Sequence, residues 1–419
     1  MSHKTSPVIN QPEQDNFVPA NKSLIKKVVF ILLPLLFIAA AALGIYQWQF
    51  STETGKDALY NGVSDGSLQD YYNFAQQQTT ASDTTRITLY AIGDIMLSRN
   101  VAGQMSKNHK DSFWPFRALE DELHSTDFNF GNLESPFSGG DEFNPTGSLV
   151  FNAPTWALPG LAQYNFKVLN LANNHAYDQG KDGLLYTKKI LNDNNLLGLG
   201  VGANLNEAWQ GHVYSVKGVR IGFVGASYAS VNDGGVAINQ NVARIEDVER
   251  LKKSIADLKT KSDFIIATMH AGTEYTYQPN QGQIDFAHAA IDAGADMVIG
   301  AHPHWVQTTE KYKDKYIFYS LGNFVFDQMW SQETKEGLML KISLEKNSSC
   351  STMPNASASG QQQVSCSDSL QGSPVPATLK QVDLVPVVIE NYGQPRLANP
   401  TEKQNILKKI GVSLDILTP

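Results

Sequence analysis

The stretch from Met269 to His304 limits the fold of this chain more than any other segment does. It is entered from Asp263–Met269, a short apolar run rich in residues that favour β-strands. Gln281–Ala293 has the apolar spacing of a helix, and Ala295–Ile299 is a second short apolar run. Strand, helix and strand in this order predict two buried, neighbouring strands of an α/β fold.

Histidines follow both of these predicted strands. His270 comes directly after the first strand, with Glu274 four residues further on, and the second strand is followed by His302 and His304. Side chains just past the carboxyl ends of neighbouring strands lie at one edge of a sheet, where α/β proteins bind ligands. The two loops therefore predict a metal or phosphate site at this edge. A structural role for each histidine is the alternative, with Pro303 serving only to fix its loop.

Strands and helices alternate through the rest of the chain from about residue 86. The predicted elements are strands at Ile87–Ile92, Asp127–Leu133, Lys167–Leu171, Val219–Val224 and Tyr316–Leu321, helices at Gly183–Asn194 and Ile245–Thr260, a hairpin of Gly337–Leu344 with Leu379–Ile389, and a last helix at 402–417. This alternation is typical of the α/β class, and it predicts one folded domain over residues 86–419.

An apolar segment without charged residues, Val28–Tyr46, lies near the N-terminus. Its length of roughly 19 residues is close to what a helix needs to cross the hydrocarbon core of a membrane. Lys26 and Lys27 precede it and Trp48 follows it, which predicts a cytoplasmic N-terminus and a main domain outside. We therefore expect a disordered tail at 1–27, a single-pass transmembrane signal anchor at 28–48, a linker at 49–85 and localisation at the cell membrane. A cleaved signal peptide and a buried core helix are the alternatives.

Two cysteines, Cys350 and Cys366, lie in a segment rich in serine, asparagine and glutamine. In an exported chain, such a close pair predicts a disulfide that closes a surface loop. This loop would belong to a disordered insert at about 346–377. The alternative is two free thiols in a flexible loop. Neither cysteine lies near a histidine in the sequence, which argues against a zinc site with cysteine ligands.

Polar loops also follow the earlier predicted strands. Asp94 follows the first strand on a glycine turn, Asn132 and Glu134 end the second, and Asn174 and His175 follow the third. Together with the three later histidines, these side chains would supply mixed oxygen and nitrogen ligands, which suit Mn, Fe or Zn better than Ca or Mg. Two such ions about 3.5–4 Å apart, bridged by one carboxylate, would activate water. Taken singly, the Gly-Asp pair can be a plain turn, and the asparagines can be turn and helix-capping residues.

Other polar residues near these loops have two interpretations each. Asp178, three residues beyond His175, could orient the imidazole or cap the following helix. Arg99 could bind a substrate carboxylate or phosphate, or be a solvated surface residue. Asn323, in the loop from Ser320 to Gln328, could line the pocket or satisfy its own turn.

The polar loops resemble a known set of motifs. They read AIGDIML, GNLESPFS, LANNHAYDQG, HAGTEY, GAHPHWVQ and YSLGNFVFDQ, and in this order they resemble the motifs of the CapA capsule-synthesis family, including its membrane-anchored poly-γ-glutamate synthesis proteins. That family is itself similar to the calcineurin-like metallophosphoesterases. The match runs from about Thr88 to Gln328. The resemblance implies a four-layer α/β/β/α sandwich with a two-metal site at the strand ends.

The resemblance also implies roles for single residues. The metal ligands would be Asp94, Glu134, Asn174, His270, His302 and His304, with Glu134 as the bridging carboxylate. His175 would contact the scissile group, with Asp178 as its partner. We expect substrate contacts at Arg99, Asn132, Glu274 and Asn323.

One position departs from the phosphoesterase pattern. That pattern has a histidine ligand two residues after the first aspartate, where this chain has Met96. One metal position would therefore lack a ligand, for which Asp178, Glu274 or a water molecule could compensate.

These inferences predict a membrane-anchored, extracytoplasmic CapA-like metallo-hydrolase with one or two divalent transition metal ions. It would act in the synthesis, release or modification of an anionic capsule polymer such as poly-γ-glutamate, at a phosphoester or an amide bond. The expected partners are the membrane, the anionic surface polymer or its precursor, and capsule synthase membrane subunits. Nucleic acid is not expected, because a net charge of -8 offers no basic excess to meet phosphates. The alternative is a non-catalytic export or scaffold subunit of a capsule polymer synthase complex.

Overall fold

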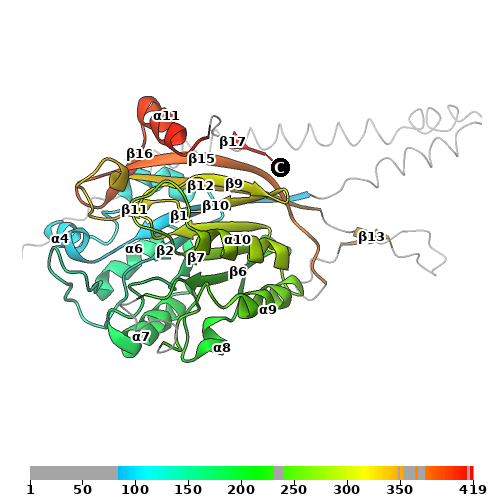
Figure 1. Cartoon of the computed structure of the whole chain (residues 1–419), viewed down its shortest axis with the longest axis horizontal. Coiled ribbons are helices and arrows are strands. Elements are labelled where there is room, and N and C mark those ends of the chain that lie inside the picture. The colour runs from blue at the N-terminus through cyan, green and yellow to red at the C-terminus, as the bar shows by residue number, and fades with distance from the viewer. Residues whose placement is uncertain are drawn as a thin grey trace, which may run out of the picture. The chain divides into compact units, whose positions relative to one another are not determined.

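Two β-sheets form the centre of the part of the chain that the structure describes (Figure 1). The structure is a computed structural model, and it describes residues 84–230, 239–347, 350–352, 364–366, 373–412 and 416–418. All of these belong to one compact unit, which begins at Ser82. None of the helices within these ranges combines the length and the apolar character that a membrane span requires. The predicted tail at 1–27, the anchor at 28–48 and the linker as far as residue 83 lie outside the described residues.

The first sheet holds the strands nearest the N-terminus of the described chain. Its strands run in the order β16-β15-β12-β1-β2-β3-β4, while β11 pairs with β1 and β17 pairs with β15. β1 to β4 are parallel, and the hairpin of β12 and β15 continues the sheet in antiparallel fashion. Their bounds are β1 Thr84–Ile95, β2 Phe128–Leu133, β3 Phe166–Asn170, β4 Leu197–Leu199, β11 Asn323–Val325, β12 Glu336–Asn347, β15 Thr378–Glu390, β16 Gln394–Leu397 and β17 Ile416–Leu417.

The second sheet contains the strands that were predicted around the histidine loops. Its order is β5-β6-β7-β8-β10-β9, and β6, β7, β8 and β10 are parallel. Their bounds are β5 His212–Val216, β6 Val219–Ser227, β7 Phe264–His270, β8 Met297–Ala301, β9 Thr309–Tyr312 and β10 Lys315–Phe318. The predicted strand–helix–strand order is therefore present, and it produces two neighbouring parallel strands, β7 and β8.

Helices connect the strands. Their bounds are α4 Arg99–Lys107, α5 Glu120–His124, α6 Leu158–Gln163, α7 Gly180–Asp193, α8 Leu205–Ala208, α9 Val248–Lys259, α10 Gln281–Ala293 and α11 Pro400–Lys409. The ends of α10 are fixed locally. Asn280 and Gln283 form a capping box at its start, and Gly294 takes a left-handed φ of 111° at its end.

Alternation of apolar residues along the strands explains how the layers stack. In β7, Phe264 and Ile266 face the core between the two sheets, while Ile265 and Ala267 face α9 and α10. A strand with both faces covered places successive apolar side chains on opposite sides. The same alternation holds in β1, where Leu89 contributes to the core between the sheets. The two sheets therefore pack face to face, with α9 and α10 covering the outer face of the second.

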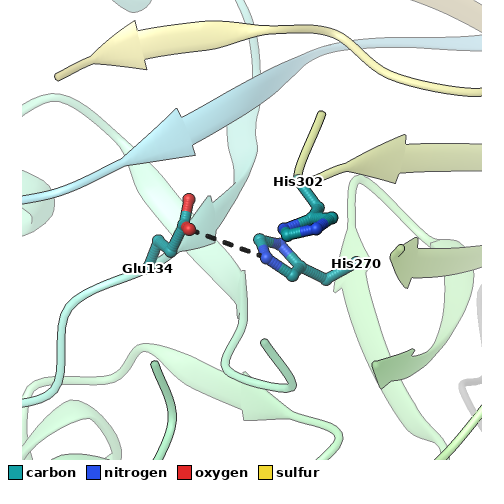
Figure 2. Close-up of side chains that lie close together, drawn as sticks. All are labelled: Glu134, His270 and His302. Carbon is teal, nitrogen blue, oxygen red and sulfur yellow. Dashed lines mark ion pairs between the residues drawn. The ribbon is translucent and has the colours of Figure 1, made fainter. Parts of the chain in front are cut away.

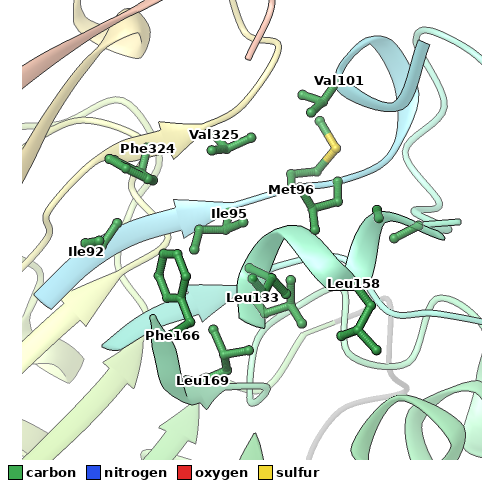
Figure 3. Packing of buried hydrophobic residues seen from close by; sticks show 14 of the residues in the cluster. Ile92, Ile95, Met96, Val101, Leu133, Leu158, Phe166, Leu169, Phe324 and Val325 are labelled. Atoms are coloured by element: carbon green, nitrogen blue, oxygen red, sulfur yellow. The ribbon is translucent and has the colours of Figure 1, made fainter. Parts of the chain in front are cut away.

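The outer face of the first sheet packs against α4, α6 and α7. Figure 3 shows this cluster, in which Ile92 and Ile95 of β1 approach Phe166 of β3. Leu158 of α6 and Val101 of α4 belong to the same buried cluster. The structure thus confirms the mixed α/β class with two sheets.

Three predictions need correction or remain untested. The predicted last helix at 402–417 ends at Lys409, and Ile416–Leu417 instead pairs with β15 as a strand. Most of the predicted insert at about 346–377 lies outside the described residues, but its backbone forms a small sheet of β13, Cys350–Thr352, and β14, Val364–Cys366. Cys350 is opposite Cys366 in this pairing. Their side chains lie outside the described part, so the disulfide stays a prediction.

Candidate metal centre

The carboxyl ends of five parallel strands, three from the first sheet and two from the second, carry the polar loops. The residues at these ends are Asp94 on β1, Asn132 and Glu134 at β2, Asn174 and His175 after β3, His270 on β7, and His302 and His304 after β8. All of them are buried, with at most 7% of any residue exposed. Burial of so many polar groups in one place requires that they satisfy one another or a bound cation.

Asp94 is delivered by a close approach of two backbones. A Cβ atom on Gly93 would lie 2.0 Å from the carbonyl oxygen of Gly322, so only glycine fits there. A glycine turn was predicted at this point, but the strand continues to Ile95. Its register is irregular on either side of Asp94. Nδ2 of Asn132 donates to Oδ1 of Asp94 at 2.8 Å, and the backbone N–H of His302 donates to Oδ2 at 3.3 Å.

Glu134 belongs to two groups of side chains that could hold a metal ion, and Figure 2 shows it facing His270 and His302. Its ligand oxygen and the ring nitrogens of His270 and His302 lie within 4.8 Å of one another, and so do the ligand atoms of Asp94, Glu134 and His304. Oε1 of Glu134 is 3.6 Å from Nε2 of His270. Both groups share Glu134, which is the geometry of one carboxylate between two cation positions.

The two histidines after β8 have unusual backbone conformations. His302 has a φ of 101° and His304 a φ of 59°, in the region that favours glycine. Such strain persists only where the surroundings impose it, and it is concentrated at functional sites. Nδ1 of His304 lies 2.9 Å from Oδ1 of Asn323. When this nitrogen carries the proton and donates it to Asn323, the other ring nitrogen is free to bind a cation.

Amide side chains hold His270 from both sides. Oδ1 of Asn174 is 2.8 Å from Nε2 of His270, and Nδ2 of Asn132 is 3.1 Å from Nδ1. Asn170 donates in turn to Oδ1 of Asn132 at 2.9 Å and to the carbonyl of Ala172 at 2.8 Å. Asn132, which was expected to contact substrate, is 2% exposed, and its amide nitrogen contacts Asp94 and His270. The contact of Asn170 with this site was not predicted from the sequence, because only the pairing of β2 with β3 brings Asn170 to Asn132.

Burial sets the protonation of the cluster. Burial and the nearby charge of Asp94 raise the pKa of Glu134 well above its usual range. Burial and the neighbouring histidines hold the pKa of His270 and of His302 well below the usual range. Burial thus favours the neutral form of His270 and His302, which is the form that binds a metal. The carboxylate would gain most from a cation that replaces its proton.

Buried polar atoms without hydrogen-bond partners indicate that these residues could hold a metal ion. Both carboxylate oxygens of Glu134 and Nδ1 of His302 are buried, and they have no hydrogen-bond partner among the described residues. Orphaned buried acceptors are costly, and a cation between them would remove the cost. The donor set of carboxylates, one amide oxygen and imidazoles suits Mn, Fe or Zn.

His175 lies beside this cluster. Its Nε2 is 3.9 Å from Oε1 of Glu134, while Nδ1 is 2.7 Å from Oδ2 of Asp178. The same oxygen of Asp178 accepts from the backbone N–H of Phe151 at 2.5 Å. The ring of Phe151 stacks on that of His175, with centroids 3.7 Å apart. Asp178 does not cap α7, whose N-cap is Gln179.

Arg99 is buried and has partners within the protein. Its guanidinium forms an ion pair with Asp327 and donates to the carbonyl of Ser148 at 3.2 Å. It lies over the rings of Phe151 and Phe326. Its charge is thus compensated inside the protein, and its burial excludes a solvated surface residue, while a substrate contact stays a prediction.

Met96 faces the apolar core. It is fully buried in the cluster on the outer face of the first sheet, with Val101 nearby in Figure 3. Its sulfur accepts a hydrogen bond from the backbone N–H of Ser98 at 3.1 Å. The side chain at this position therefore contributes to the core rather than to the ligand groups around Glu134.

Tyr275 lies at the rim of the cluster and was not predicted from the sequence. Its ring is 6.0 Å from that of His304 and packs edge-on against Trp330, which is 62% exposed. Burial and the charge of Glu274 raise the pKa of Tyr275 to about 12. Glu274, an expected substrate contact, is exposed beside it. The HAGTEY motif includes both residues, but the sequence does not show where their side chains point.

Comparison with known proteins gives a consistent result. Residues 88–328 match the family described as bacterial capsule synthesis protein PGA_cap. The PGA biosynthesis protein CapA of Bacillus subtilis is 32% identical over 330 residues, which cover 78% of this chain and 79% of that protein. The capsule biosynthesis protein CapA of Bacillus anthracis is 32% identical over 276 residues, or 63% and 66% of the two chains. A phosphatase structure from Mycoplasma pneumoniae is 15% identical with a TM-score of 0.39, covering 63% of this chain and 89% of the other.

Proposed function

Because this chain belongs to the bacterial capsule synthesis protein family, we propose that it is a membrane-anchored metal-dependent hydrolase of capsule polymer biosynthesis. It acts outside the cytoplasm, in the synthesis, release or modification of an anionic polymer such as poly-γ-glutamate. The fold that carries it is proposed to be the four-layer sandwich of the metallophosphoesterases. The bond that it cleaves is a phosphoester or an amide.

The observation that supports this proposal most is the shared position of Glu134 between two buried ligand groups. Asp94 and His304 would hold one cation with Glu134, and His270 and His302 would hold the other. Asn174 would complete the second position through its amide oxygen, which already lies 2.8 Å from Nε2 of His270. A divalent metal pair, when bound, supplies charge that polarises the scissile group and lowers the pKa of water.

The chain's own residues would orient the substrate and exchange a proton with it. His175 presents Nε2 toward the centre because Asp178 engages Nδ1 at 2.7 Å. This nitrogen would give a proton to the leaving group, while Phe151 closes one side of the imidazole. The described residues around the cluster offer Arg99 as a cation, but Asp327 already pairs with it. We therefore expect no unpaired cationic side chain among the described residues to meet the negative charge of the substrate.

Polymer production in cells tests the catalytic part of the proposal. His175→Ala and Asp94→Asn should each abolish polymer output while the protein stays abundant on an immunoblot. Asp182→Asn is the matched control, because Asp182 is an exposed acid in the first turn of α7. Full output from both site variants would instead favour the non-catalytic export or scaffold subunit.

Cell fractionation tests the anchor separately. The proposal places residues 28–48 in the membrane, so the full-length chain should remain in the membrane fraction after washing with high salt. Release into the salt wash would contradict a transmembrane anchor, whatever the result for catalysis.

A further inference from the structure

A chain of hydrogen bonds runs outward from a proposed metal ligand to the rim. Nδ1 of His304 lies 2.9 Å from Oδ1 of Asn323. Nδ2 of Asn323 donates to Oε1 of Gln328 at 3.2 Å, and Nε2 of Gln328 donates to the hydroxyl of Tyr275 at 3.3 Å. Asn323 also donates to the carbonyl of Thr334 at 2.9 Å, which fixes the direction of its amide. Each amide therefore donates away from His304.

This direction decides what the hydroxyl of Tyr275 can do. Because Gln328 donates to the phenolic oxygen, a lone pair is used and the O–H remains available as a donor. The carboxylate of Glu274, which is exposed, lies near this hydroxyl at the rim. An exposed acceptor is exchanged at small cost, since water can solvate the carboxylate that is released.

The position of Tyr275 is imposed by its surroundings. Its φ is 61°, which a bulky residue rarely adopts. Its backbone N–H donates at 2.9 Å to the carbonyl of Pro303, the residue between the two proposed histidine ligands. Its ring lies between those of His304 and Trp330. The strained turn thus holds one aromatic hydroxyl at the mouth of the centre.

We propose that Tyr275 is a substrate-binding residue whose hydroxyl donates a hydrogen bond to a negatively charged oxygen of the substrate. The substrate class is one with an anionic oxygen at the reacting group, either the phosphoryl oxygen of a phosphoester or the oxygen of an amide carbonyl as it gains charge. Gln328 is a positioning residue, since it acts through Tyr275. This inference rests on the proposed hydrolase function and adds a neutral hydrogen-bond donor at the rim of the cluster.

Binding of inorganic phosphate to the full-length, Mn-loaded protein tests this role by calorimetry. Tyr275→Phe removes only the hydroxyl, so it should keep the bound metal and weaken phosphate binding about tenfold, the factor expected for one lost hydrogen bond to a charged group. Tyr277→Phe is the matched control. Tyr277 lies on the same loop, but its hydroxyl donates to Glu333 at 3.3 Å. It should bind phosphate as the unmodified protein does.

The outcomes separate this inference from the proposed function. Equal phosphate affinity in the unmodified protein and in Tyr275→Phe, including an equal lack of binding, overturns the role of Tyr275. Absence of bound Mn from the unmodified protein overturns the metal centre instead. Gln328→Leu should weaken phosphate binding in the same direction as Tyr275→Phe, and an unchanged affinity there would overturn the positioning role.

Discussion

Oε1 of Glu134 lies 3.6 Å from Nε2 of His270, and neither oxygen of this carboxylate has a hydrogen-bond donor among the described residues. Two buried groups in this relationship neither repel as like charges nor satisfy each other. Burial raises the pKa of the acid and lowers that of the imidazole, so it favours the uncharged form of each when no cation is bound. The arrangement therefore costs stability in the metal-free protein and lowers the cost of binding a metal.

Replacement of Glu134 by glutamine separates these two effects. Glu134→Gln removes the titratable acid from the core, and we expect the metal-free protein to become more stable by about 1–3 kcal/mol at neutral pH. The rise in Tm on adding Mn should disappear, because the shared ligand is lost. Thermal unfolding with and without a chelator measures both.

A second buried glutamate provides the contrast. Glu336 is 5% exposed but pairs with Nζ of Lys409 at 2.9 Å. Glu336→Gln should destabilise the protein, because it removes the nearer of the two carboxylates that pair with the half-buried ammonium of Lys409 and leaves only Glu333 at 3.3 Å. A stability loss for Glu134→Gln as large as that for Glu336→Gln would contradict the account of Glu134.

Met96 offers a test of whether the missing histidine can be restored. Met96→His should add no bound metal and should destabilise the protein by about 2–3 kcal/mol, since it places an imidazole in an apolar cluster. Met96→Leu should cost under about 1.5 kcal/mol. Chemical unfolding and metal analysis of both variants check this, and an extra metal ion in Met96→His would show that the side chain reaches the centre.

Asp178 should act on activity far more than on stability. Asp178→Asn keeps the shape but removes the charge opposite Nδ1 of His175. We expect hydrolysis of a generic phosphoester to fall about 10–100-fold with the metal content unchanged. Asp182→Asn, in the first turn of α7, should retain full activity. Loss of metal from Asp178→Asn would instead make Asp178 a ligand.

The C-terminal helix predicts a pH effect that is independent of the metal centre. Glu402 completes the capping box of α11 and pairs with Arg396 at 2.7 and 3.0 Å. The hydrogen bond from Arg396 lowers the pKa of Glu402 to about 2. Because the folded pKa is below the ordinary value of 4.5, this stabilisation is present above about pH 4.5 and is lost as the pH falls toward 2.

Urea unfolding across this range measures the effect. Glu402→Gln should lower the free energy of unfolding by about 1 kcal/mol at pH 7, after allowance for solvent screening, and the difference should shrink below pH 4.5. Glu249 is the control for an exposed ion pair, because its side chain is 85% exposed and, among the described residues, pairs with Lys252 alone. A difference for Glu402→Gln that does not change with pH would contradict the ion pair.

Local sequence signals predicted much of the fold. α10 has the predicted bounds, because the capping box of Asn280 and Gln283 and the glycine at 294 mark both ends. The hairpin of β12 and β15 follows from two long apolar runs. The prediction that the last helix continues to residue 417 was wrong, because Ile416 and Leu417 form a strand whose partner, β15, is distant in the sequence.

The site could be predicted only in part. The motifs place Asp94, Glu134 and the histidines at strand ends, and the structure gathers them around one carboxylate. Contacts between distant segments were not predictable, such as the stacking of Phe151 on His175. The direction of a side chain was not predictable either. The sequence therefore did not show that Met96 faces the core or that Asn170 donates a hydrogen bond to Asn132.

Metal analysis of the purified full-length chain tests the central claim most directly. Glu134 and the groups on either side of it should retain at least one transition metal ion per chain, of the Mn, Fe or Zn class, through extensive dialysis. Asp94→Asn and Glu134→Gln should lose it while remaining folded. Less than one tightly bound ion per unmodified chain, or full retention in both variants, would contradict the metal centre.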